Sequence, residues 1–168
     1  MIFRRLILIL TAALSAWAAG SATAVTTTTS WASTGSGPHG IAIDASGNVY
    51  TANFAANSIT KVAPDGTTTT SWASTGSGPY GIAIDASGNV YTANYTANTI
   101  TKVAPDGTAT ASWASTGSGP TGIAIDASGN VYTANYGANS ITKVAPDGTA
   151  TTSWATTNTR PHGIAIDA

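Results

Sequence analysis

The chain has 168 residues, no cysteine, a net charge of −1 and only 8% charged residues. This composition excludes a disulfide-stapled scaffold and thiol chemistry. The scarcity of lysine and arginine argues against nucleic acid as a partner. Gly, Thr, Ser, Ala and Asn dominate, and these residues are typical of short strands and turns rather than helices. Because 42% of the residues are hydrophobic and the net charge is small, we expect a folded chain rather than a disordered one.

The start of the chain has the features of a targeting segment. Two arginines precede the apolar stretch Leu6–Ala19, which is too short for a comfortable membrane span. Ala22-Thr23-Ala24 matches an A-x-A cleavage site. We therefore expect residues 1–24 to be a signal peptide. The mature chain 25–168 would be secreted or periplasmic and would keep no stable membrane span. An uncleaved anchor is the alternative.

The rest of the chain is a repeat with a period of 41 residues. Tryptophans mark the period at Trp31, Trp72, Trp113 and Trp154. The repeats are 30–70, 71–111 and 112–152, followed by a partial repeat 153–168. The first and second differ at six of 41 positions, and the second and third at four. A period near 40 with several strands per unit is typical of a propeller blade rather than a helical solenoid.

Each repeat predicts four strands joined by tight turns. In the first repeat the predicted strands are Gly40–Asp44, Asn48–Asn53, Ser58–Ala63 and Thr67–Ala73. Ser-Gly-Asn and Pro-Asp-Gly sequences between them favour turns in which glycine relieves the backbone. One such antiparallel sheet cannot bury both of its faces, so the repeats must stack face to face. The predicted fold class is all-β, a β-propeller with four-stranded blades.

The strand count predicts an incomplete ring. The mature chain opens with a fourth-type strand at Thr26–Ser33 and closes with a first-type strand at Gly163–Asp167. The total is 14 strands, or about 3.5 blades, which predicts an incomplete or open arc. Further repeats beyond Ala168, or other chains, would have to complete it. Open blade edges of this kind invite self-association.

The repeat resembles known propeller families. Pro-x-Gly-Ile-Ala-Ile-Asp-x-x-Gly-Asn-Val-Tyr, Asn-x-Ile-x-Lys and Pro-Asp-Gly resemble the NHL-type repeat over the whole mature chain, and Tyr50-Thr51-Ala52-Asn53 resembles the YVTN-type repeat of secreted microbial proteins. The rhythm is also similar to that of the streptogramin (virginiamycin B) lyases. The resemblance implies a closed ring of about six or seven blades. For the lyases it also implies a histidine and glutamates that hold magnesium, and this chain has no glutamate.

The repeats differ mainly at one end of the predicted blades, where the link from fourth to first strand meets the turn between the second and third. We call the following seven residues the variable rim: His39, Tyr80, Thr121 and His162 at one repeat position, and Phe54, Tyr95 and Tyr136 at another. Variation over a fixed scaffold is typical of a binding face. The rim is therefore the predicted site for a small molecule, a glycan or a protein. Drift after recent duplication is the alternative explanation.

Catalytic and metal sites are not predicted. His39 and His162 are the only histidines, they lie three repeats apart, and no carboxylate stands near either on the rim. The seven acidic residues are all aspartates. They end the first strands or sit in Pro-Asp-Gly turns, where we expect them to cap their own turns. We expect no cofactor. The favoured function is a secreted binding or scaffold module, and the alternatives are a lyase-like or lactonase-like enzyme and a structural surface protein.

Overall fold

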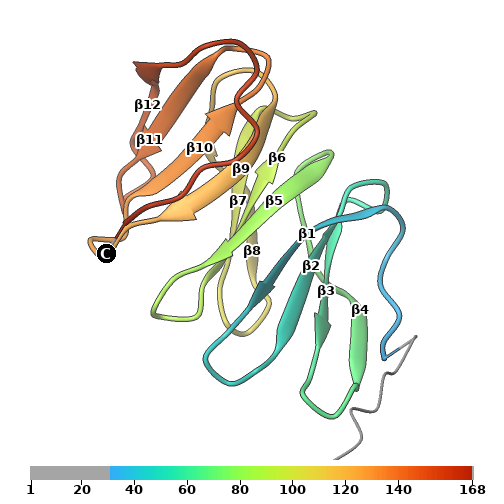
Figure 1. Ribbon diagram of the computed structural model, residues 1–168. Helices are drawn as coiled ribbons and strands as arrows, with labels where there is room; N and C mark the ends of the chain where they lie inside the picture. Colours follow the sequence, from blue (N-terminus) through green and yellow to red (C-terminus); the bar gives the residue numbers. More distant parts are fainter. Residues whose placement is uncertain (1–30, 168) are drawn as a thin grey trace, which may run out of the picture.

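The computed structural model describes residues 31–167, which form three four-stranded antiparallel sheets (Figure 1). Blade 1 comprises β1 (Pro38–Ile43), β2 (Val49–Asn53), β3 (Ser58–Val62) and β4 (Thr68–Ser74). Blade 2 comprises β5 (Pro79–Ile84), β6 (Val90–Asn94), β7 (Thr99–Val103) and β8 (Ala109–Ser115). Blade 3 comprises β9 (Pro120–Ile125), β10 (Val131–Asn135), β11 (Ser140–Val144) and β12 (Ala150–Thr156). The predicted signal peptide, residues 1–24, lies outside the described residues.

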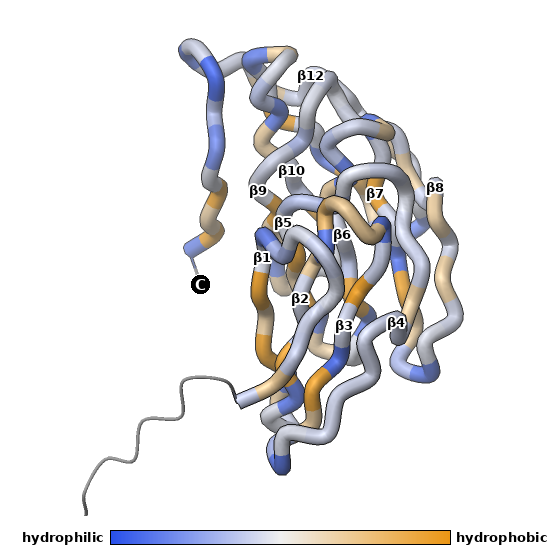
Figure 2. Tube along the Cα trace, turned by 90° about the vertical axis from the view of Figure 1, so that its right-hand side faces the viewer, coloured by the Kyte–Doolittle hydropathy of each residue, from blue (hydrophilic) through white to orange (hydrophobic). Residues whose placement is uncertain are grey.

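The fold class predicted from the repeat is confirmed. Strands follow one another in chain order within each sheet, as a meander requires. The inner strands β1, β5 and β9 lie close together, whereas the outer strands β4, β8 and β12 meet at few points. The blades therefore fan outward from their inner strands, as Figures 1 and 2 show. This arrangement is an open arc of a β-propeller. Within residues 31–167 no helix is long and apolar enough to cross a membrane.

One of the 14 predicted strands, Gly163–Asp167, is not a strand in the structure, and another, Thr26–Ser33, lies mainly outside the described residues. Residues 31–33 of the predicted strand Thr26–Ser33 are irregular, and its first five residues lie outside the described part. The segment 163–167 runs along blade 3 but belongs to no sheet (Figure 2). A first-type strand pairs with the second strand of its own blade, and no such strand follows within the described residues. The segment therefore has no ladder to join.

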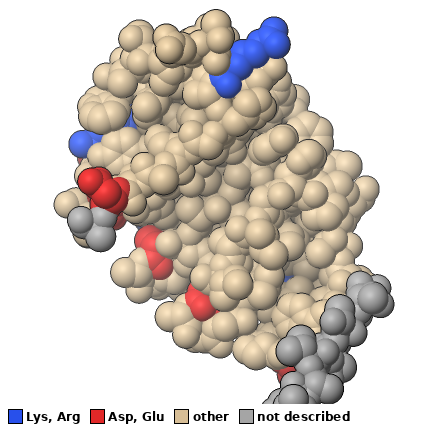
Figure 3. Space-filling view, in the orientation of Figure 1, with Lys and Arg blue, Asp and Glu red and all other residues tan. Residues whose placement is uncertain are grey.

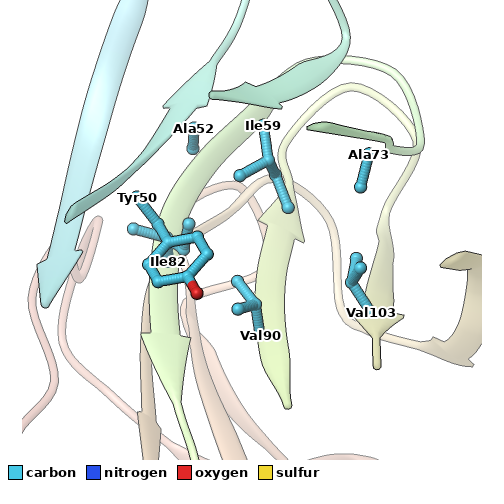
Figure 4. Close-up of a cluster of buried hydrophobic side chains, with 7 residues drawn as sticks. All are labelled: Tyr50, Ala52, Ile59, Ala73, Ile82, Val90 and Val103. Carbon is cyan, nitrogen blue, oxygen red and sulfur yellow. The ribbon is translucent and has the colours of Figure 1, made fainter. Parts of the chain in front are cut away.

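The hydrophobic core lies between the blades rather than within them. We call the side of a blade that meets the following blade its downstream face, and the other side its upstream face. Tyr50 and Ile59 on the downstream face of blade 1 pack against Val90 and Val103 on the upstream face of blade 2 (Figure 4). Ile59, Val90 and Val103 are fully buried. An equivalent cluster joins blade 2 to blade 3.

Glycines at the start of the inner strands allow the blades to approach this closely. A Cβ at Gly40 would lie 2.5 Å from the carbonyl oxygen of Tyr80, and one at Gly122 would lie 2.6 Å from that of His162. A Cβ at Gly81 would likewise overlap the carbonyl oxygen of Thr121. Real Cβ atoms do not come this near to backbone oxygens, so any larger residue would push the blades apart.

Each turn after an inner strand is closed by an aspartate, as the sequence predicts. In blade 2 the backbone N–H groups of Ser87 and Asn89 donate to Oδ1 of Asp85, both at 2.9 Å. The Asn89 side-chain amide and the Tyr91 hydroxyl donate to Oδ2, at 2.8 and 3.0 Å. Burial raises the pKa of Asp85, but the hydrogen bonds from Asn89, Tyr91 and Ser87 outweigh it and hold the pKa below its usual value. In blade 1, burial together with the hydrogen bond to Asp44 and its charge raises the pKa of Tyr50 to about 12.

The close approach of the blades gives a first prediction. Gly81→Ala should lower the free energy of unfolding by about 1–3 kcal/mol, because the added methyl meets backbone that cannot move freely. Urea denaturation followed by tryptophan fluorescence measures the change. Gly163→Ala is the matched control in the same local sequence, since nothing lies within 4 Å of a Cβ there. Equal effects of the two substitutions would contradict the packing argument.

The aspartate turns predict a loss of stability in acid. Their folded pKa lies below the unfolded value of about 3.9. The stabilisation is therefore complete above that value and is lost as the pH falls through the folded pKa. The urea midpoint should drop between pH 5 and pH 2, and Asp85→Asn should make that drop shallower. Tyr91→Phe removes one of the four donors to Asp85. The drop in its urea midpoint should therefore be intermediate between that of wild type and that of Asp85→Asn. An identical acid dependence in wild type and Asp85→Asn would refute the assignment.

Candidate functional site

The seven rim residues lie at one end of the blades, where the sequence places them. His39 and Tyr80 stand at the second position of β1 and β5, and Phe54 and Tyr95 follow β2 and β6 directly. The His39 and Tyr80 rings are stacked with centroids 4.4 Å apart. Phe54 meets His39 edge-on at 5.3 Å, and Tyr95 lies 6.3 Å from Tyr80. These four rings form one continuous aromatic group across blades 1 and 2.

A second aromatic pair stands across a hollow from this group. The Tyr136 and His162 rings have centroids 4.7 Å apart. Five residues line the hollow of about 190 Å³ between them and the first group: Tyr80, Tyr95, Thr121, Tyr136 and His162. The repeat position that carries His39, Tyr80 and His162 carries the smaller threonine in blade 3. The hollow therefore lies where the aromatic row is interrupted.

Thr121 has a different role from the other rim residues. Its side chain is buried, with 4% of its surface exposed. Its hydroxyl lies 2.9 Å from the carbonyl oxygen of His162 and 3.2 Å from those of Pro161 and Ala134. The residue thus forms the base of the hollow and ties segment 161–162 to blade 3. The sequence placed Thr121 correctly on the rim but did not show that its hydroxyl is already engaged.

Asparagines hold the rim loops in place. Asn57, with φ 51°, accepts a 2.8 Å bond at its side-chain oxygen from the backbone N–H of Gly78, and Asn98 accepts one of 2.7 Å from Gly119. Each bond joins the second-to-third turn of one blade to the link that enters the next. The aromatic side chains are therefore mounted on loops that are fixed before any ligand arrives.

Arg160 is a rim residue that the sequence reasoning missed. It occupies the repeat position of Gly78 and Gly119, and keeps a positive φ of 56°. Its backbone N–H donates to Oδ1 of Asn139 at 2.8 Å, as the glycines do in the other blades. Its guanidinium carbon lies 5.4 Å from the centroid of the Tyr136 ring, one wall of the hollow. An arginine in a glycine position of an otherwise regular repeat was the signal that could have revealed it.

The described rim does not fit the magnesium site that the lyase resemblance implies. Magnesium needs oxygen ligands, usually including a carboxylate, and the rim offers imidazoles, phenols and a guanidinium. The aspartates of the three blades lie at the other end of the strands, where their carboxylates accept hydrogen bonds within their own turns. Among residues 31–167 no group of three or more His, Cys, Asp or Glu is placed to hold a metal ion. Figure 3 shows a face on which charged residues are few and separated.

Larger hollows lie at the aspartate end of the blades but have a different character. Two of about 440 and 420 Å³ are lined mainly by the Asp-Ala-Ser turns of neighbouring blades. Their carboxylates already accept hydrogen bonds from backbone, asparagine and tyrosine donors. The first has no aromatic residue in its lining, and the second has only Tyr50, whose hydroxyl already donates to Asp44. The rim hollow is smaller, but its aromatic walls make it the better candidate for a ligand.

Three blades with an aromatic hollow at one end define the chain as a β-propeller with a candidate ligand site. The model of the virginiamycin B lyase family matches residues 16–168. The chain therefore belongs to the virginiamycin B lyase family. A search of curated protein sequences gives no match.

Solved propellers share this fold. Virginiamycin B lyase from Staphylococcus aureus is 22% identical with a TM-score of 0.60, over 69% of this chain and 40% of the lyase. Hydrazine synthase from Kuenenia stuttgartiensis is 22% identical with a TM-score of 0.67, over 76% and 38%. A protein described as a gluconolactonase is 16% identical with a TM-score of 0.58, over 75% and 50%. The chain thus spans half or less of each structure, and identities this low show the fold alone.

Proposed function

We propose that the protein is a secreted or periplasmic binding module whose variable rim holds a single sugar-like ring. The observation that carries the proposal is the hollow over Thr121, framed by Tyr80, Tyr95, Tyr136 and His162. Fixed aromatic walls around a small hollow suit a ligand with flat apolar faces. Ligand sites for drug-sized molecules are usually larger, about 300–1,000 Å³. A hollow of about 190 Å³ therefore favours one ring rather than a large macrocycle.

The polar groups around the hollow favour a hydroxylated ligand. Tyrosine hydroxyls both donate and accept hydrogen bonds, and a neutral imidazole does the same through its two nitrogens. Sugar hydroxyls need this mixture of partners, while the faces of a sugar ring can lie against aromatic rings. Arg160, over the Tyr136 ring, would accommodate an acidic substituent at the edge of the hollow. A glycan, a free sugar and a sugar-like small molecule share this chemistry.

A glycan array with neutral and acidic sugars, followed by calorimetry on the best ligand, tests the proposal. Tyr95→Ala with Tyr136→Ala should weaken binding at least tenfold, because each loses an aromatic wall of the hollow. Trp31→Ala is the control, since Trp31 is 45% exposed and lies against Gly66 at the opposite end of the blade. Binding that is unchanged in the double variant, or lost equally in the control, would move the site elsewhere.

A second candidate function is that of an enzyme, which membership of the virginiamycin B lyase family favours. The lyase and gluconolactonase structures share the fold, and a lyase-like or lactonase-like activity is the form that this second candidate would take. Against it stands the described rim, which lacks carboxylates for the implied magnesium. On the binding proposal, virginiamycin B and gluconolactone should disappear no faster with the protein than without it, with or without added magnesium. Mass spectrometry measures both compounds, and protein-dependent loss of either would favour the enzyme.

A further inference from the structure

Four aromatic rings of the rim lie outside the packing that holds the blades together. The two hydrophobic clusters between the blades contain neither His39 nor Phe54. Tyr80 and Tyr95 are also absent from both clusters. His39 is exposed, and the other three side chains are partly exposed. The core between the blades therefore does not account for these rings.

Three of these rings form a triangle with nearly equal sides. The Phe54 centroid lies 6.4 Å from that of Tyr80 and 6.5 Å from that of Tyr95. The Tyr80 and Tyr95 centroids are 6.3 Å apart. His39 extends the triangle, stacked at 4.4 Å on Tyr80 and edge-on at 5.3 Å to Phe54. We call these four residues the aromatic platform.

The aromatic platform is continuous with the rim hollow because the two share residues. Tyr80 and Tyr95 line the hollow, whereas His39 and Phe54 do not. A ligand that extends from the hollow past these two tyrosines meets Phe54 and His39 next, because both contact Tyr80. The hollow of about 190 Å³ suits a single ring. Any further ring of the same ligand would therefore lie on the platform.

The backbone fixes the platform before any ligand arrives. The backbone N–H of Phe54 donates to the carbonyl oxygen of Gly37 at 2.7 Å, and that of Tyr95 donates to Gly78 at 2.8 Å. A Cβ at Gly78 would lie 3.0 Å from the Phe54 ring, so the ring rests directly against the link between blades 1 and 2. Because the rings are already held, binding costs little further side-chain entropy.

The platform combines apolar faces with polar edges. Phe54 offers only its ring. The core tyrosines Tyr50 and Tyr91 donate their hydroxyls to aspartates at the other end of the blades. No aspartate of the described blades stands at the rim end, so the hydroxyls of Tyr80 and Tyr95 are not taken in this way. A sugar ring needs both features, since its C–H faces lie against aromatic rings and its hydroxyls seek polar partners.

We propose that the platform is a second subsite, which binds the following rings of a linear oligosaccharide whose first ring occupies the hollow. The inference rests on the proposed function, because a sugar in the hollow supplies the chain that continues along the rim. A linear oligosaccharide fits both places because every unit presents another ring with apolar faces and hydroxyls. A free monosaccharide would use the hollow alone.

Calorimetry with sugar chains of increasing length tests the proposal. The probes are the members with one to four rings of the cello-oligosaccharide, chito-oligosaccharide and oligogalacturonate series, and of the series to which the best array ligand belongs. In a series that binds, the affinity of wild type should rise about tenfold or more between one ring and three, because the later rings gain aromatic contacts.

Substitutions at Phe54 separate the two subsites. Phe54→Ala should lower the ratio of three-ring to one-ring affinity about tenfold, because it removes a platform ring that does not line the hollow. Phe54→Tyr is the matched control and should keep the ratio, since Tyr95 and Tyr136 stand at the same repeat position. Tyr136→Ala removes a wall of the hollow and should weaken every chain length by a similar factor. If circular dichroism shows that Phe54→Ala is unfolded, His39→Ala replaces it and should also lower the ratio.

The outcomes distinguish this inference from the proposed function. If neither the glycan array nor these series show binding at any length, both fail. If one ring binds and longer chains bind no better, only the second subsite is refuted, and wild type alone reveals this. A gain with length that survives in the folded Phe54→Ala or His39→Ala variant would refute it as well. Binding of apolar peptides on a peptide array, in place of sugars, would overturn the assignment to an oligosaccharide.

Discussion

A four-stranded sheet of this size has two faces and no means of burying either one by itself. This constraint governs the whole molecule. In blade 2 both faces are covered, with Val90 and Val103 against blade 1 and Tyr91 and Ile100 against blade 3. Ile82 is 8% exposed and Ile41 is 66% exposed, although their local sequences are nearly the same. The neighbouring blade, not the residue type, decides which isoleucine contributes to stability.

The turn chemistry connects local sequence to this packing. Tyr91 donates its hydroxyl to Asp85, and its ring meets Trp113 at 5.3 Å in the core between blades 2 and 3. The Lys102 ammonium lies 5.6 and 5.4 Å from the centroids of the same two rings. Tyr91 thus contacts the aspartate turn, the Lys102 ammonium and the core between blades 2 and 3. This coupling explains how a chain with few large aliphatic residues builds a specific structure.

The sequence predicts the parts of the structure that depend on neighbours along the chain. The predicted strand Ser58–Ala63 ends one residue beyond β3, because Pro-Asp-Gly determines where that strand stops. The position of the rim follows from the meander in the same way. The features missed depend on neighbours in space. The burial of Thr121, the guanidinium of Arg160 over Tyr136 and the unpaired segment 163–167 each need the adjoining blade, or its absence among the described residues, to be seen.

Because the repeats are nearly identical, the differences between the blades are concentrated at the rim. Because the scaffold beneath each blade is the same, a substitution at the rim changes the shape of the surface without moving its support. Tyr80 in blade 2 and Thr121 in blade 3 stand at equivalent points of β5 and β9, and only the second leaves room beside it. A single change from aromatic to threonine therefore converts a continuous aromatic row into a row with one hollow. The change leaves the supporting packing unaltered, since every repeat supplies that packing.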